Sequence, residues 1–177
     1  MFEKYFPYDT PRPQQTEIFE FIEKNIDKKY FLINAPTGVG KSGISYALAR
    51  YFGSAWILTE TKSLQDQYTR EFNDLPSIKG KSSYTCNVKR DETVDNGPCN
   101  YHENTLKMCK MVKRCSYYNA FDEGMSKNVT VTNYDMIFGL TFKRNGENSN
   151  FFKRDIAICD EGHVLEDKIV AQASFVI

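Results

Sequence analysis

The sequence predicts an α/β fold in which a mostly parallel sheet carries an inserted, cysteine-bearing segment. Short apolar strands alternate with amphipathic helices along most of the 177 residues. A glycine-bearing turn joins an early strand to a helix, and the alternation stops after Pro76 before it resumes near Ser116. We therefore expect one domain in two parts, residues 1–76 and 117–177, around an insertion at 77–116.

The elements can be assigned in order along the chain. Ile18, Phe19 and Ile22 follow helical spacing and predict a first helix over 13–26. The further elements expected before the insertion are a strand at 30–34, a helix at 41–52, a strand at 55–59 and a helix at 62–72. The elements expected after it are a helix at 116–125, a strand at 129–132, a turn at Asn145-Gly146 and a strand at 152–160.

Composition excludes some classes of protein. No apolar run approaches the roughly 18 residues of a membrane span, and the proline-broken N-terminus does not resemble a secretory signal. We expect a cytoplasmic or nucleoid-associated protein with no membrane partner. Basic and acidic residues balance at 23 each, but eight basic and only four acidic residues lie between Lys79 and Arg114. This basic segment fits either a polyanion partner or an ordinary solvated surface.

A phosphate-binding loop occupies residues 35–42, with the sequence APTGVGKS. It follows an apolar strand and opens a helix, as a P-loop requires. Glycines allow successive backbone N–H groups to face phosphate oxygens, and Lys41 can neutralise the β- and γ-phosphates. The Ser42 hydroxyl can bind Mg²⁺. The nucleotide-binding residues expected within the loop are Thr37, Gly38, Val39, Gly40, Lys41 and Ser42.

Two adjacent acids, Asp160 and Glu161, follow the last apolar strand. Asp160 can hold Mg²⁺, and Glu161 can orient and deprotonate an attacking water molecule. Together with Lys41 they form the expected catalytic set. His163 could relay the nucleotide state or serve only as a hydrogen-bonding group.

Four of the five cysteines cluster in the basic segment and are expected to bind a metal. Cys86, Cys99, Cys109 and Cys115 are separated by 12, 9 and 5 residues, with no Cys-x-x-Cys pair. This spacing alone fits zinc and a [4Fe–4S] cluster about equally. The fifth, Cys159, is expected to be an ordinary buried thiol.

Several motifs together resemble the superfamily 2 helicases, and more closely the XPD/DinG family of iron–sulfur helicases. They are RPQQ at 12–15, TETKSLQDQ at 59–67, KGKSSYTC at 79–86, CSYYNA at 115–120, VTNYDM at 131–136 and DEGHVLED at 160–167. The resemblance implies a RecA-like lobe that binds ATP and Mg²⁺ and belongs to a 5′→3′ DNA helicase. It also implies that the four clustered cysteines hold a [4Fe–4S] cluster.

The resemblance implies further roles for particular residues. Arg12 and Gln15 match the segment that reads adenine. Thr59, Thr61 and Gln67 match a motif that lies against single-stranded DNA, although Thr and Gln at such a turn serve equally well as helix caps. The basic residues and tyrosines expected to meet single-stranded DNA or a junction are Lys89, Arg90, Lys110, Lys113, Arg114, Tyr84, Tyr101, Tyr117 and Tyr118.

Nothing after His163 resembles the second RecA-like lobe that such a motor needs. We expect that lobe to come from a longer chain or from a partner, and we expect the 177 residues alone not to unwind duplex DNA. Two other readings remain open: a P-loop NTPase or kinase with a zinc-binding insertion, and a nucleic-acid-binding module that does not hydrolyse ATP.

Overall fold

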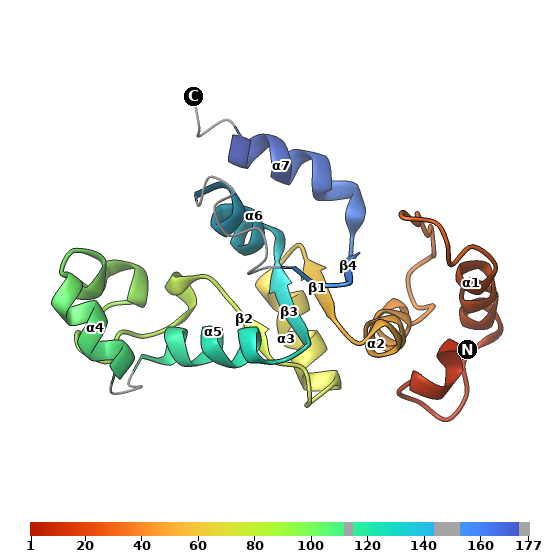
Figure 1. Ribbon diagram of the computed structural model, residues 1–177, viewed down its shortest axis with the longest axis horizontal. Helices are drawn as coiled ribbons and strands as arrows, with labels where there is room; N and C mark the ends of the chain where they lie inside the picture. Colours follow the sequence, from red (N-terminus) through yellow and green to blue (C-terminus); the bar gives the residue numbers. More distant parts are fainter. Residues whose placement is uncertain (112–114, 144–152, 174–177) are drawn as a thin grey trace.

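One parallel sheet lies at the centre of the computed structural model, which describes residues 1–111, 115–143 and 153–173 (Figure 1). The strands lie in the order β2-β3-β1-β4. They are β1 (Ala55–Thr59), β2 (Ser77–Ile78), β3 (Val129–Asn133) and β4 (Ile156–Cys159). Ile57 in the middle of β1 lies opposite Val131 of β3 and Ile158 of β4. The expected parallel α/β fold is confirmed.

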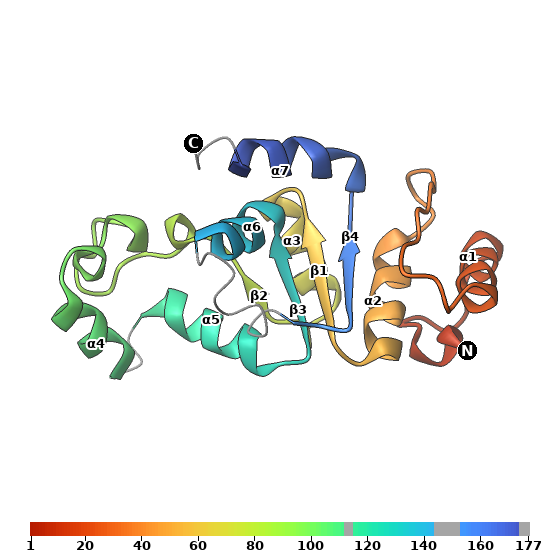
Figure 2. The ribbon, with the colours of Figure 1, turned by 45° about the horizontal axis from the view of Figure 1, so that its top comes forward.

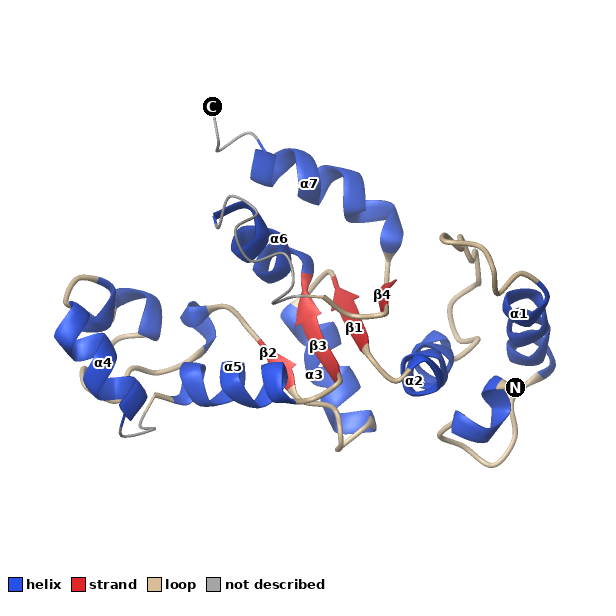
Figure 3. Cartoon of the chain, in the orientation of Figure 1, coloured by secondary structure: helices blue, strands red, loops and turns tan. Residues whose placement is uncertain are grey.

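Helices cover both faces of the sheet (Figure 3). The helices α2 (Lys41–Phe52) and α3 (Lys62–Glu71) pack against the face that carries Ile57. On the other face, which carries Trp56, lie α5 (Ser116–Ser126) and α6 (Tyr134–Lys143). All five residues of β1 are buried because both faces of this central strand are covered.

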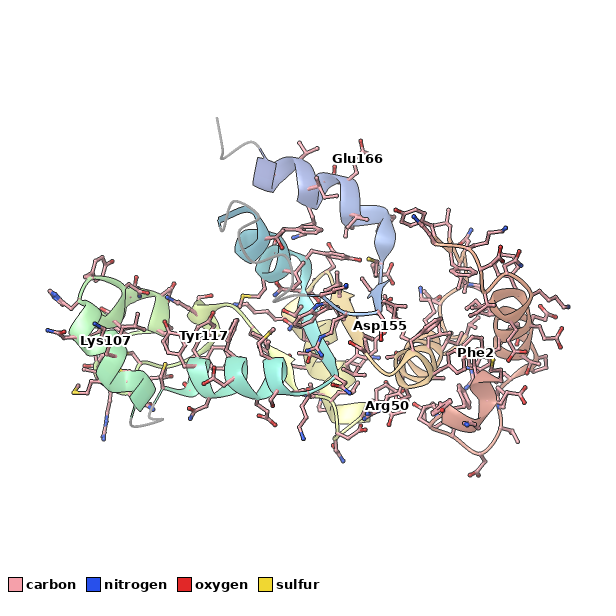
Figure 4. The ribbon with its side chains drawn as sticks, in the orientation of Figure 1. Phe2, Arg50, Lys107, Tyr117, Asp155 and Glu166 are labelled. Carbon is pink, nitrogen blue, oxygen red and sulfur yellow. The ribbon has the colours of Figure 1, made fainter. Side chains whose placement is uncertain are left out.

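The chain ends lie outside this three-layer core. A 3₁₀ turn at Phe2–Tyr5 and helix α1 (Pro13–Lys24) pack on the outer side of α2. Phe2 is fully buried there, among the side chains of both helices (Figure 4). At the other end of the chain, α7 (Leu165–Ala173) crosses the carboxyl ends of the strands (Figure 2).

The cysteine-bearing segment forms a lobe at the end of the molecule opposite α1 (Figure 1). It contains helix α4 (Glu103–Met111) and 3₁₀ turns at Lys81–Ser83, Val94–Asn96 and Pro98–Asn100. The weak apolar periodicity of the segment did not predict α4. The short strand β2 falls within the range assigned to the insertion but hydrogen-bonds to β3, so it belongs to the sheet.

The strand expected at 30–34 is absent from the described sheet, which ends at β4. Tyr30 and Leu32 are 91% and 95% exposed, so their apolar side chains contribute nothing to the core. An apolar run predicts a strand only where a sheet edge pairs with it, and sequence does not show whether that edge lies within reach.

The expectation that Cys159 is a buried thiol is wrong. Cys159 is exposed at the end of β4. Residues along β4 alternate between half-buried and exposed, since Ile156 and Ile158 pack against the α2 side while Ala157 and Cys159 face away from it. An edge strand covered on one side gives this pattern.

Two expectations remain, one about the turn and strand near the C-terminal part of the sheet and one about membrane-spanning helices. The expected turn at Asn145-Gly146 and the first residue of the strand expected at 152–160 lie outside the described residues. Among the helices that the structure describes, none has the length and apolar character that crossing a membrane requires.

Candidate nucleotide-binding site

The phosphate-binding loop has the backbone shape that its glycines predict. Gly38 and Gly40 both have φ 84°, a left-handed conformation that side chains with a Cβ rarely adopt. Gly40 is the N-cap of α2, so Lys41 and Ser42 occupy the first positions of that helix. The N-terminus of α2 therefore directly follows the loop, and its free N–H groups favour the binding of an anion there.

Arg12 and Gln15 hold this loop from α1. The Arg12 guanidinium donates from Nη1 to the Gly38 carbonyl at 2.7 Å. Gln15 is buried, and its amide nitrogen donates to the carbonyls of Val39 at 2.9 Å and Gly40 at 3.2 Å. Its Oε1 accepts the Arg12 backbone N–H at 2.8 Å. Both side chains thus hold the backbone of the loop through its carbonyl groups. The sequence spacing did not predict this structural role.

The two acids follow β4 directly. The Asp160 N–H donates to the Leu58 carbonyl at 2.8 Å and extends the β1–β4 ladder by one residue. Glu161 then has φ 53° and ψ 45°, in the left-handed region. Outside glycine this conformation is uncommon and carries strain, which tends to collect at functional sites.

The loop and the acids meet beyond the carboxyl end of β4. Lys41 Nζ lies 3.3 Å from Glu161 Oε1, and both side chains are about one-third exposed. The other Glu161 oxygen lies 3.4 Å from His163 Nδ1. Of the two roles considered for His163, the structure shows this contact with Glu161 and no more.

A cavity of about 580 Å³ joins these groups. Nearly all of the predicted nucleotide-site residues line it: Arg12, Gln15, Thr37, Gly38, Gly40, Lys41, Ser42, Asp160 and Glu161. Val39 does not line the cavity, because its side chain packs against the core between α1 and α2 and its carbonyl is bonded to Gln15.

The cavity is also lined by residues that the sequence did not single out. Phe6 and Tyr8 of the N-terminal segment line it, together with Leu64 and Glu71 of α3. Tyr8 hydrogen-bonds to Glu71. Burial, followed by the hydrogen bond and the charge of Glu71, raises the pKa of Tyr8 to about 12. The aromatic run before Arg12 is the signal that could have predicted the contribution of Phe6 and Tyr8 to this lining.

The Thr and Gln residues of the second motif divide between two roles. Thr61 is the N-cap of α3, and its hydroxyl accepts the Leu64 N–H at 3.3 Å, so the helix-capping interpretation is confirmed for it. Thr59 is fully buried and donates to the Thr61 carbonyl at 3.2 Å. Gln67 lines the nucleotide cavity.

The four clustered cysteines gather in the lobe around one small core. Cys86, Cys109 and Cys115 are buried with Val94 and Tyr117, whereas Cys99 is half-buried. Figure 4 shows Tyr117 at the start of α5, where the lobe joins the rest of the molecule.

The thiols of the lobe interact with one another. A side chain at Gly97 would begin 3.1 Å from the Cys86 sulfur and 3.7 Å from the Cys99 sulfur. Burial, followed by the neighbouring thiols, raises the pKa of Cys109. Within the described ranges, however, no three Cys, His, Asp or Glu side chains are grouped as ligands of one metal ion.

Four of the nine residues expected to contact DNA already pack or pair within the protein. Tyr117 is buried, and the rings of Tyr84 and Tyr118 pack against it at 5.7 and 5.1 Å. Lys89 pairs with Glu92 at 3.1 Å. Tyr101, by contrast, is 74% exposed. The side chains of Lys110, Lys113 and Arg114 lie outside the part that the structure describes.

Comparison with protein families agrees with this geometry. The model of the family described as type III restriction enzyme, res subunit (ResIII) matches residues 9–175. The chain belongs to the ResIII family. ResIII domains are helicase-like members of superfamily 2, and the parallel four-stranded α/β sheet of the chain is consistent with a RecA-like lobe of such a protein. No curated protein matches the sequence.

Proposed function

We propose that this ResIII domain is the ATP-binding motor lobe of a DNA helicase similar to the XPD/DinG family. The observation that carries the proposal is the single cavity in which the P-loop residues Lys41 and Ser42 face the acids Asp160 and Glu161. A strand-end acid opposite a P-loop is the arrangement that NTP hydrolysis uses.

The donor groups at the cavity fit a nucleotide with Mg²⁺. Hydroxyl and carboxylate oxygens are ligands that Mg²⁺ prefers, and Ser42 and Asp160, which line the same cavity, supply one of each. The bound ion would neutralise phosphate charge. The left-handed glycines and the N-terminus of α2 would hold the phosphates themselves.

Lys41 and Glu161 have linked roles in this account. A triphosphate at the loop would compete with Glu161 for the Lys41 ammonium, since phosphate carries more negative charge than one carboxylate. Glu161 would then be released to accept a proton from the attacking water. Arg12 and Gln15 would hold the conformation of the loop. Because both residues line the cavity, we also propose that they contact the adenine.

Fast hydrolysis needs a second RecA-like lobe. The cavity is lined by residues of one lobe, and helicases of this superfamily close a second lobe over the nucleotide and supply an arginine from it. Such a charge on the transferred phosphate accelerates hydrolysis by about 10³ or more. We expect the chain by itself to bind nucleotide and hydrolyse it slowly. Fast hydrolysis would require the second lobe, supplied either in the same chain or by a partner.

The cysteine lobe is proposed to hold a [4Fe–4S] cluster through Cys86, Cys99, Cys109 and Cys115. The four thiols surround one small core that contains few apolar side chains, so bonds to metal would supply much of its stability. Zinc is the alternative occupant. Iron and sulfide analysis of protein purified without oxygen distinguishes the two.

Single-stranded DNA is the proposed polymer substrate, in the 5′→3′ direction that the XPD/DinG resemblance implies. Exposed Tyr101 and the basic residues of the lobe form the proposed contact surface. The most direct experiment measures ATP hydrolysis with and without single-stranded DNA, in a form that contains both lobes. DNA stimulation that is lost in Glu161→Gln supports the proposal, and hydrolysis independent of DNA argues for an ordinary P-loop NTPase.

A further inference from the structure

The carboxylate of Asp160 has a hydrogen-bond partner that no motif predicts. The Tyr68 hydroxyl, from α3, donates to Asp160 Oδ2 at 3.1 Å. The two residues are 92 positions apart in the sequence. Tyr68 is therefore brought to the end of β4 only by the packing of α3 against the sheet.

The position of the Tyr68 ring is fixed by the core. The side chain is 1% exposed and belongs to the cluster that α2, α3 and the sheet form together. Its ring lies 6.2 Å from that of Phe72, the C-cap residue of α3. A ring enclosed on all sides has little freedom, so its hydroxyl presents a donor at a defined place.

A second polar side chain lies at that hydroxyl. Ser45 of α2 is a polar neighbour of the Tyr68 oxygen. Ser45 is itself buried and lies one helical turn after Lys41. The P-loop helix, helix α3 and the acid at the end of β4 therefore meet at one phenolic oxygen.

The remaining polar atoms of Asp160 are also held. Its Oδ1 accepts the Glu161 N–H at 3.1 Å, and its backbone carbonyl accepts the Tyr134 hydroxyl at 2.9 Å.

We propose that Tyr68 is a positioning residue, which orients the Asp160 carboxylate for the Mg²⁺ that accompanies bound nucleotide. The inference rests on the proposed function, because it requires Asp160 to meet the metal ion. Groups that hydrogen-bond to a ligating carboxylate set its direction, and their loss commonly weakens metal binding by about 10- to 100-fold. Tyr68 would act through Asp160 without touching the nucleotide.

Calorimetric titration of the full chain with ATPγS, in Mg²⁺ and again in EDTA, tests this role. The quantity that matters is the Kd in EDTA divided by the Kd in Mg²⁺, because this ratio isolates the contribution of the metal. We expect Tyr68→Phe to lower this ratio by about tenfold while the Kd in EDTA stays unchanged. Tyr46→Phe is the matched control, because it removes a hydroxyl that bonds Asp74 at 3.0 Å on the protein surface.

A double-mutant cycle separates positioning from structural support. In an Asp160→Asn background, Tyr68→Phe should change the ratio no further. An unchanged ratio in Tyr68→Phe, or an equal decrease in the presence and absence of Asp160, overturns the proposal.

Two further outcomes are decided in advance. Should Tyr68→Phe fail to fold, as judged by circular dichroism, the same titrations on Ser45→Ala replace it: a lowered ratio supports the proposal and a wild-type ratio contradicts it. A wild-type chain whose affinity does not depend on Mg²⁺ at all refutes the proposed function, whatever the variants do.

Discussion

Lys41 Nζ lies 3.3 Å from Glu161 Oε1, although 120 residues separate them in the chain. The pair joins the start of α2 to the residue that follows Asp160, and both side chains line the nucleotide cavity. In this structure, the lysine proposed to bind phosphate and the glutamate proposed to activate water therefore pair with each other.

Glu161→Gln should abolish ATP hydrolysis while nucleotide binding is retained. The amide keeps the shape of the side chain but cannot accept the proton of the attacking water. It also removes the charge that holds Lys41, so affinity for ATPγS should stay equal or rise. Turnover by the two-lobed form and calorimetry of the single chain measure the two effects. Substantial turnover in Glu161→Gln would assign the base elsewhere.

Gly40→Ala should weaken nucleotide binding. Its φ of 84° is strained for alanine, and the new Cβ would lie 2.6 Å from Gln15 Nε2, which would have to leave the loop carbonyls. Gly53→Ala is the matched control, since φ is 78° there with no atom within 4 Å of the new Cβ. Both variants should lose about 1–2 kcal/mol of stability from the backbone strain. Only Gly40→Ala should lower affinity for ATPγS, and equal affinities in the two variants would contradict this account of the loop.

Gly124→Ala should destabilise the sheet face that α5 covers. The new Cβ would lie 2.5 Å from Ile78 Cγ1 and 3.0 Å from Thr130 Cγ2, where overpacking costs about 1–3 kcal/mol. Gly139→Ala in α6 meets no atom within 4 Å and should instead be neutral or stabilising by about 0.5–1 kcal/mol. Urea unfolding of the two variants measures the difference. Equal stabilities would place α5 further from β2 than the structure has it.

Cys86→Ser should remove the metal proposed for the lobe, whereas Cys159→Ser should not. Cys86 is buried beside Cys99 at Gly97, but Cys159 stands exposed at the far edge of the sheet. Iron, sulfide and zinc analysis of both variants after anaerobic purification checks this. Metal retained at the wild-type level in Cys86→Ser would exclude it as a ligand.

Tyr101→Ala should weaken binding of single-stranded DNA by about 1–3 kcal/mol, the usual contribution of one stacked base. Tyr101→Phe should bind as the wild type does, because stacking uses the ring and not the hydroxyl. Fluorescence anisotropy with a labelled oligonucleotide measures both. Unchanged binding in Tyr101→Ala would exclude this exposed tyrosine from the proposed DNA-binding surface.

The parts of the fold that the sequence predicted share one property: their patterns are local. The helix that begins at Lys41 follows a glycine turn, and strand β1 is a short apolar run enclosed by polar residues. The residues at 30–34 carry the same kind of run yet stay outside the described sheet. Pairing with a sheet edge is a long-range property, and no local pattern encodes it.

The site divides in the same way. Lys41, Ser42, Asp160 and Glu161 could be named because their spacing from a strand or turn is fixed by the chemistry of phosphate. Tyr68 could not be named, because its contact with Asp160 depends on how α3 packs. The packing of Tyr84 and Tyr118 on Tyr117 likewise appears only in three dimensions.

A crystal structure of the chain with ATPγS and Mg²⁺ tests the central claim most directly. The account predicts a triphosphate against Gly38, Gly40 and Lys41, with a metal ion between Ser42 and Asp160 and with Glu161 released from Lys41. A nucleotide bound elsewhere on the molecule, or density at the loop with Asp160 turned away from the metal, would contradict it.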